Sequence, residues 1–150
     1  MRLNTTGDRI NIEDRIRNIR EVLDGQPGIL AAYVFGSYGT PDQTPLSDVD
    51  IAILYEAGRQ PDLEEELHLG RLVSEAAEED DVNLTILNDA PLRLQHLVLA
   101  TGRPIYICNP LGVAGFQELV CKIYGDFAID LGVFYAEHRI GLREVFGLGR

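Results

Sequence analysis

Two apolar segments joined by a short polar loop constrain the fold of this chain more than any other feature. The segments are Ile29–Phe35 and Val49–Tyr55, and each has the length and the side chains of a buried strand. The loop between them, residues 36–47, contains two glycines and two prolines, which disfavour a full helix. A parallel pair would need a long crossover, usually a helix, to bring the chain back to the same edge. We therefore expect the two strands to be antiparallel neighbours.

The remaining segments predict helices and two further short strands. Apolar residues at helical spacing indicate helices over 12–24, 62–79, 91–101 and most of 114–146, and segments 82–87 and 104–108 have the character of strands. We predict an α+β fold with a mixed sheet of about four strands, helices on one face and a long C-terminal helix. The chain length suits a single domain over residues 1–150.

The last predicted helix carries a stripe of aromatic side chains at helical spacing. The stripe either packs into the core or forms a docking face for a helical partner. The members of the stripe are Tyr124, Phe127, Phe134 and Tyr135.

The two cysteines, Cys108 and Cys121, lack the spacing of a disulfide framework or a zinc site, and we expect both to be small buried residues.

Charge and composition exclude some classes of function. The formal net charge is −11, and Lys122 is the only lysine. Such a surface would repel a polyanion, so we expect no direct binding of nucleic acid. The chain has neither a long apolar run nor an apolar leader, so we predict no membrane span and a cytoplasmic location.

Two aspartates open the second apolar segment. Side chains alternate along a strand, so Asp48 and Asp50 face one side while Val49 and Ile51 face the other. Two carboxylates this close repel each other unless a cation lies between them, and oxygen ligands that leave room for water and phosphate suit Mg²⁺. The simpler alternative is a solvated turn with no metal.

The first apolar segment ends in Gly36-Ser37. Gly36 lets a phosphate approach the backbone closely, and the hydroxyl of Ser37 can donate to a phosphate oxygen. A metal site beside a phosphate cradle predicts phosphoryl or nucleotidyl transfer.

The whole arrangement resembles the minimal nucleotidyltransferases, small members of the DNA polymerase beta superfamily. Their signature is Gly-Ser, ten residues and Asp-x-Asp, and here residues 38–47 separate Ser37 from Asp48. The resemblance continues through VNLTILNDAP, PLRLQHLVLATG and PIYIC to cover nearly the whole chain. It implies a polymerase-beta-like nucleotidyltransferase fold.

The resemblance also implies an activity and a partner. The family includes antitoxins that transfer AMP from ATP to a tyrosine of a small helical toxin of the HEPN type, which forms a hetero-oligomer with the antitoxin. By position, Asp48 and Asp50 would hold Mg²⁺, and Gly36, Ser37 and Ser47 would bind ATP.

The loop departs from the family pattern at one position. The family usually has an arginine where Thr40 stands, so a cation on the phosphate side is missing. Another arginine could replace it in space, and the sequence does not decide which. The candidates are Arg59, Arg71, Arg93 and Arg103.

The second departure concerns the third catalytic carboxylate of the superfamily, whose place is taken by Asn83. An amide oxygen can bind a metal, but it cannot act as a base at neutral pH. Asp81 lies two residues earlier, about 6–7 Å from the ideal position if the strand extends that far.

Three outcomes therefore stay open: a working enzyme, in which Asp81 or the partner could assist, a degenerate relative that only binds nucleotide, and an antitoxin that neutralises its partner by binding. Nucleotidylation of a small molecule is disfavoured, because the chain offers no second domain to hold the acceptor.

Overall fold

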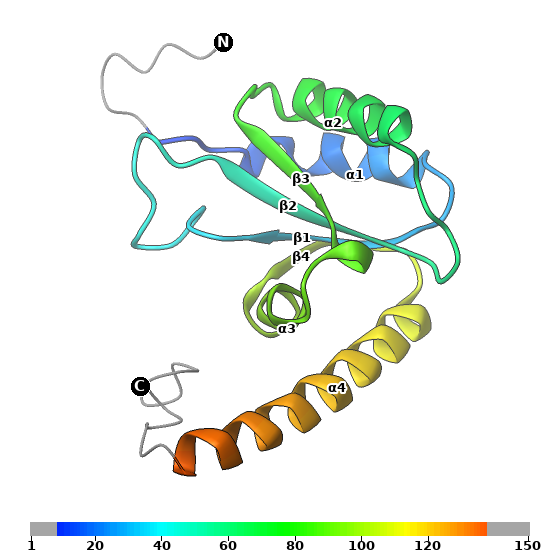
Figure 1. Cartoon of the computed structure of the whole chain (residues 1–150). Coiled ribbons are helices and arrows are strands. Elements are labelled where there is room, and N and C mark those ends of the chain that lie inside the picture. The colour runs from blue at the N-terminus through cyan, green and yellow to red at the C-terminus, as the bar shows by residue number, and fades with distance from the viewer. Residues whose placement is uncertain (1–8, 138–150) are drawn as a thin grey trace.

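The computed structural model describes the backbone of residues 9–137 and the side chains as far as residue 125 (Figure 1). Within residues 9–137, four α-helices and four strands follow one another in the predicted order, with a short 3-10 helix before α1 and another after β3. The elements are η1 (Glu13–Arg15), α1 (Ile16–Asp24), β1 (Ile29–Phe35), β2 (Val49–Tyr55), α2 (Leu63–Ala77), β3 (Val82–Ile86), η2 (Leu87–Asp89), α3 (Leu92–Thr101), β4 (Arg103–Ile107) and α4 (Pro110–Glu137).

The four strands form one mixed sheet in the order β3-β2-β1-β4. β1 is antiparallel to both β2 and β4, whereas β2 and β3 are parallel. The predicted α+β class and the predicted antiparallel pair are therefore confirmed. The register places Phe35 opposite Asp50 and places Asp50 beside Asn83, so β1 ends where β2 and β3 begin.

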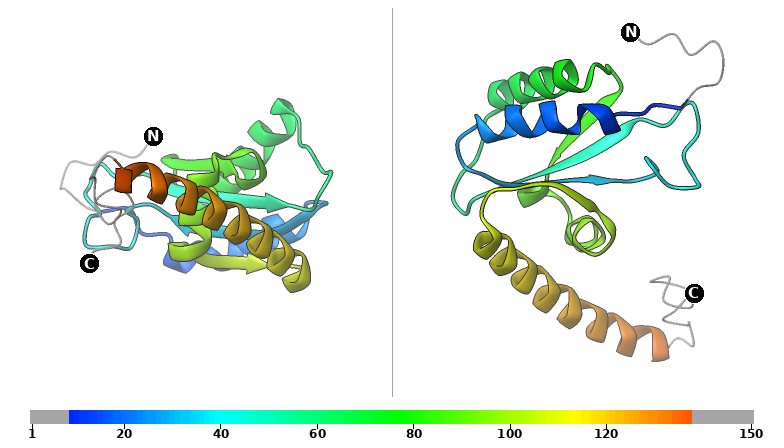
Figure 2. Two further views of the ribbon diagram at one scale, coloured as in Figure 1. Left: turned by 60° about the horizontal axis from the view of Figure 1, so that its bottom comes forward. Right: turned by 180° about the vertical axis from the view of Figure 1, so that it is seen from behind.

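Helices cover both faces of the sheet, with α1 and α2 on one side and α3 and α4 on the other (Figures 1 and 2). The prediction that the helices lie on one face is wrong. The reason is that β1 and β2 are buried along nearly their whole length, and a strand that is apolar on both sides requires cover on both. Side chains such as Ile51 and Ile53 pack towards α1 and α2, while Ala52 and Leu54 pack towards α3 and α4.

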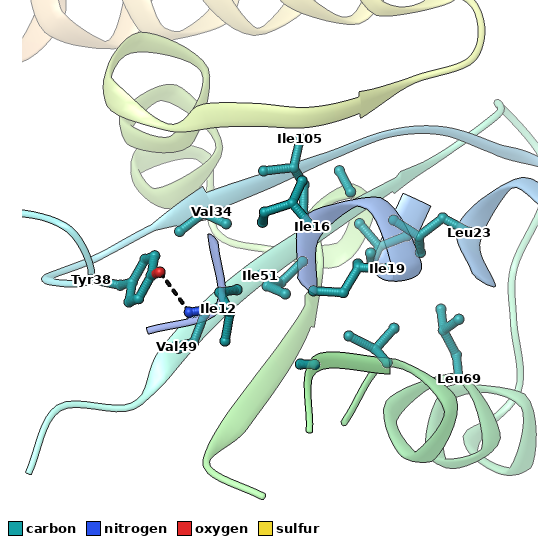
Figure 3. Packing of buried hydrophobic residues seen from close by; sticks show 14 of the residues in the cluster. Ile12, Ile16, Ile19, Leu23, Val34, Tyr38, Val49, Ile51, Leu69 and Ile105 are labelled. Atoms are coloured by element: carbon teal, nitrogen blue, oxygen red, sulfur yellow. Dashed lines mark hydrogen bonds between the residues drawn. The ribbon is translucent and has the colours of Figure 1, made fainter. Parts of the chain in front are cut away.

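The layer of α1 and α2 follows from local sequence. Ile16, Ile19 and Leu23 recur at three- and four-residue intervals and bury one face of α1 against the sheet (Figure 3). α2 begins at a capping box, in which Asp62 accepts from the backbone of Glu65 over 2.8 Å.

α4 begins earlier than the sequence predicts. The side chain of Asn109 accepts from the backbone of Gly112 over 3.0 Å, and Pro110 occupies the favourable first position of a helix. The helix then continues without a break to Glu137. Val113 and Val120 are buried, and the ring of Tyr124 stacks on His96 with 3.8 Å between centroids.

The cysteines and the aromatic stripe near the end of the chain differ in how they compare with the predictions. Cys108 and Cys121 are both exposed, so the prediction of burial is wrong: Cys108 follows the edge strand β4, and Cys121 lies on the outward side of α4. The side chains of Phe127, Phe134 and Tyr135 lie outside the described part, so the aromatic stripe stays a prediction. None of the helices in the described part of the chain combines the length and apolar character needed to cross a membrane.

Candidate functional site

Three polar side chains converge where β2 and β3 begin. Asp48 precedes β2, Asp50 lies within it, and Asn83 is the register partner of Asp50 on β3. The Asn83 Nδ2 donates to Asp48 Oδ2 over 3.1 Å and lies 3.5 Å from Asp50 Oδ1. The structure therefore brings Asn83 together with Asp48 and Asp50, and one neutral amide bridges the two carboxylates.

The two carboxylates differ in environment. Asp48 is exposed, whereas Asp50 is partly covered where β1 meets β2. Burial raises the pKa of Asp50 above its ordinary value, the hydrogen bond from Asn83 opposes this rise, and the charge of Asp48 adds to it. Holding Asp50 ionised in the folded protein therefore costs free energy, which a bound cation would offset.

The turn after β1 lies directly against Asp50. Gly36 has a φ of 79°, and a Cβ built on it would stand 2.6 Å from Asp50 Oδ2. Only glycine combines this left-handed backbone with so close an approach. Thr40 closes the turn that follows, because its backbone N–H and its hydroxyl donate to the Ser37 carbonyl over 3.0 and 2.6 Å. The hydroxyl of Ser37 makes no hydrogen bond with the described residues, so it is available to a ligand.

The hydroxyl of Ser47 is used within the loop. It accepts from the Thr44 backbone over 2.9 Å, and the Ser47 N–H donates to the Thr44 carbonyl over 3.0 Å. These bonds hold the turn that leads into Asp48. Ser47 therefore lies next to the carboxylates, and its hydrogen bonds with Thr44 stabilise the loop.

Asp81 does not join the aspartate pair. Its backbone carbonyl accepts from Val49 over 2.9 Å, and its N–H lies 3.3 Å from a carboxylate oxygen of Glu79. Among residues 9–125, no group of three or more histidine, cysteine, aspartate or glutamate side chains comes together as a metal site would require. A cation here would therefore be held by Asp48, Asp50 and the amide oxygen of Asn83.

Three of the four candidate arginines lie away from the site. Arg59 follows the opposite end of β2, where it pairs with Glu65. Arg71 pairs with Glu75 on α2. Arg93 is in the first turn of α3, which starts beyond the end of β3 that is farthest from Asn83.

Arg103 is at the correct end of the sheet but on the other face. It is the register partner of Val34, whose side chain packs on the side of α1 and α2. Its guanidinium donates to both carboxylate oxygens of Glu13, over 2.9 and 2.8 Å. The glutamate raises the pKa of Arg103, so the pair stays charged. None of the four arginines occupies the place that Thr40 leaves.

Sequence reasoning missed two residues that hold the loop in place, Tyr38 and Gln43. Both are buried, at 8% and 7% exposure, in a segment otherwise rich in glycine, proline and small polar residues. The sequence signal for such anchoring is the presence of an aromatic side chain and a long amide side chain in this loop.

Comparison with known proteins identifies the fold. The family model described as polymerase beta, nucleotidyltransferase matches residues 17–110. A search of the curated proteins found no match.

Several solved structures resemble the chain over most of its length. A chain in a crystal structure of a toxin-antitoxin with AMP-PNP has a TM-score of 0.65 and 23% identity, covering 83% of this chain and 98% of that one. A chain in the structure of a tri-AMPylated Shewanella oneidensis HEPN toxin in complex with MNT antitoxin has a TM-score of 0.64 and 21% identity, covering 86% and 99%. A chain of the toxin-antitoxin MntA-HepT has a TM-score of 0.61 and 20% identity, covering 85% and 98%. These likenesses and the family model confirm the predicted polymerase-beta-like nucleotidyltransferase fold.

Proposed function

This chain belongs to the polymerase beta nucleotidyltransferase family, and we propose that it is an antitoxin that transfers AMP from ATP to a tyrosine of a HEPN-type toxin, with Mg²⁺. The observation that carries the proposal is the convergence of Asp48, Asp50 and Asn83 against the turn at Gly36. Structural neighbours that contain AMP-PNP and an AMPylated toxin support the choice of nucleotide and partner.

The residues at this site fit a hard divalent cation. Asp48 and Asp50 offer carboxylate oxygens, and Asn83 would add its Oδ1 once its amide rotates away from the donating position. When bound, Mg²⁺ would neutralise phosphate charge and orient the displaced pyrophosphate for in-line transfer. The positive charge would also offset the cost of ionising the partly covered Asp50.

The turn at Gly36 would receive the triphosphate. The missing Cβ leaves room beside Asp50, and the Ser37 hydroxyl can donate to a phosphate oxygen. Because Thr40 supplies no positive charge here, the metal would carry most of the neutralisation of the triphosphate.

Among the described residues, no carboxylate joins the site beyond Asp48 and Asp50, which the proposal assigns to the metal. Asn83 cannot accept the proton of a tyrosine hydroxyl, and Asp81 lies outside the aspartate pair. With no base among the described residues, the proposal sends the acceptor proton to solvent or to a group on the partner. This absence favours one alternative: a catalytically degenerate antitoxin that neutralises its toxin by binding alone.

Labelling separates the two functions. We expect purified complex, given Mg²⁺ and ATP labelled at the α-phosphate, to place label on the toxin. The double variant Asp48→Asn with Asp50→Asn should abolish labelling while the complex stays intact, whereas Asp42→Asn in the exposed loop should label normally. An intact wild-type complex without label would rule out transfer and leave the binding antitoxin.

The variant Asn83→Asp tests whether the missing third carboxylate limits the rate of labelling. A faster labelling reaction is expected, because the new carboxylate can hold a cation and accept the proton of the acceptor. The single domain over residues 1–150, the cytoplasmic location and the absence of direct nucleic-acid binding stay predictions.

A further inference from the structure

Residues 10–13, which precede α1, form hydrogen bonds with the loop of the candidate site, residues 36–47. The hydroxyl of Tyr38 accepts from the Ile12 backbone over 2.9 Å (Figure 3). The same hydroxyl donates to Glu13 Oε2 over 2.7 Å. Arg103 fixes the same glutamate through two hydrogen bonds. The ring of Tyr38 is buried in the core between the sheet and α1. Tyr38 directly follows Ser37, so this anchor lies one residue from the candidate phosphate turn.

A second anchor lies a few residues farther along the loop. Gln43 Oε1 accepts from the Gly39 backbone over 2.9 Å, and its Nε2 donates to the Ile10 carbonyl over 2.9 Å. Gln43 is 7% exposed, so its bond to Ile10 is shielded from water, and the bond from Gly39 is partly shielded. The loop is thus fastened at two points to the same short segment, residues 10–13.

We infer that Tyr38, Gln43 and Glu13 form a clamp that presets the phosphate turn at Gly36 and Ser37 and thereby sets the affinity for the nucleotide. The inference rests on the proposed function and concerns positioning residues, because none of the three contacts the aspartate pair. It goes beyond the proposed function by assigning a role to a segment distant in sequence.

The physical reason is preorganisation. A loop with glycines at 36 and 39, both at positive φ, has many conformations when free, and a ligand that orders it must supply the lost entropy. The clamp supplies that ordering when the protein folds. Gly36 sets the direction of the turn, and Tyr38 holds the chain in that direction by its ring and its hydroxyl.

The test is nucleotide affinity in a variant that keeps the ring. Tyr38→Phe removes the hydroxyl and so breaks its bonds with Ile12 and Glu13. Calorimetry of the full chain with Mg²⁺ and the α,β-methylene analogue of ATP would measure this affinity. The affinity should fall by up to about tenfold, which corresponds to the buried bond with Ile12, because the bond with Glu13 is partly exposed and contributes less. In the labelling reaction, KM for ATP should rise while kcat stays near the wild-type value.

Matched variants separate positioning from general stability. Tyr106→Phe makes the same chemical change to a hydroxyl bonded to Asp24, on the edge strand and away from the loop, and should bind nucleotide like the wild type. Gln43→Glu keeps the acceptor for Gly39 but loses the donor to Ile10, and should weaken binding as Tyr38→Phe does.

The outcomes are distinct. If the wild type binds the analogue and both clamp variants bind it equally well, the inference is wrong and the proposed function stands. If Tyr38→Phe and Tyr106→Phe weaken binding alike, the effect is one of stability, and the clamp is again wrong. A wild-type chain that binds no nucleotide overturns both the clamp and the proposed function.

Discussion

The side-chain amide of Asn83 donates to Asp48 Oδ2 over 3.1 Å, across two parallel strands. The same nitrogen lies 3.5 Å from Asp50 Oδ1, so a neutral donor stands between two like charges. Part of the repulsion that a cation would otherwise neutralise is therefore relieved within the protein. A carboxylate at the same position would add to that repulsion.

Asn83→Asp should accordingly make stability depend on divalent cations. In EDTA we expect the free energy of unfolding to fall by roughly 1–2 kcal/mol, because two hydrogen bonds are replaced by like charges. Saturating Mn²⁺ should restore it. Urea unfolding with and without the metal measures both effects, and Asn83→Ala is the control that loses the donor without adding charge. Equal stability of Asn83→Asp and wild type in EDTA would contradict the bridging role of the amide.

Gly36→Ala should destabilise the protein more than Gly39→Ala. Both glycines have positive φ, so each substitution carries a backbone cost of about 1 kcal/mol. Only at Gly36 does the new Cβ also meet Asp50 Oδ2, at 2.6 Å, whereas nothing lies within 4 Å at Gly39. The difference in free energy of unfolding between the two variants isolates the contact. Equal losses would show that Asp50 moves aside at no cost.

Tyr33→Phe should leave stability unchanged or increase it by up to about 1 kcal/mol. Tyr33 is 4% exposed, and its hydroxyl has no hydrogen-bond partner among the described residues. Burial also raises the pKa of this phenol, as expected for a desolvated hydroxyl. Thermal unfolding checks the prediction, with Tyr106→Phe as a variant that loses a bond to Asp24. A clear loss of stability in Tyr33→Phe would mean that the hydroxyl has a partner.

Glu13→Gln should lower stability at neutral pH and have no effect in acid. Hydrogen bonds from Arg103, aided by one from Tyr38, hold the pKa of Glu13 below its ordinary value despite partial burial. Such a group stabilises the fold above the ordinary glutamate pKa, and the contribution disappears as the pH falls through the lowered value. Because the pair is about half exposed, we expect about 0.5–1 kcal/mol at pH 7.

Urea unfolding of wild type and Glu13→Gln from neutral pH down to pH values below the ordinary glutamate range gives the profile. Glu118→Gln, on the exposed side of α4, is the control and should track the wild type throughout. A difference between wild type and Glu13→Gln that persists unchanged in acid would show that the charge of Glu13 is not what matters.

Much of the architecture could be predicted because it depends on short segments. The loop over residues 36–47 is too poor in helix formers for a crossover, so β1 and β2 had to be antiparallel. The placement of the helices on the two faces of the sheet was harder to predict. β1 and β2 are apolar on both sides, and that pattern indicates burial without showing which helix covers which side. The exposed Cys121 was missed for a related reason, since a helix with a mostly apolar sequence does not reveal which of its sides meets solvent.

Local sequence was enough to predict some parts of the site. Alternation along one strand places Asp48 and Asp50 on the same face, and the spacing from Ser37 identifies the family pattern. The surroundings of these residues depend on how distant segments pack together. The parallel register brings Asn83 to Asp48 from 35 residues away, and packing against η1 joins Tyr38 to Glu13. The register of β4 on β1 places Arg103 on the opposite face. Register and layer packing depend on segments far apart in the chain, so no local pattern contains them.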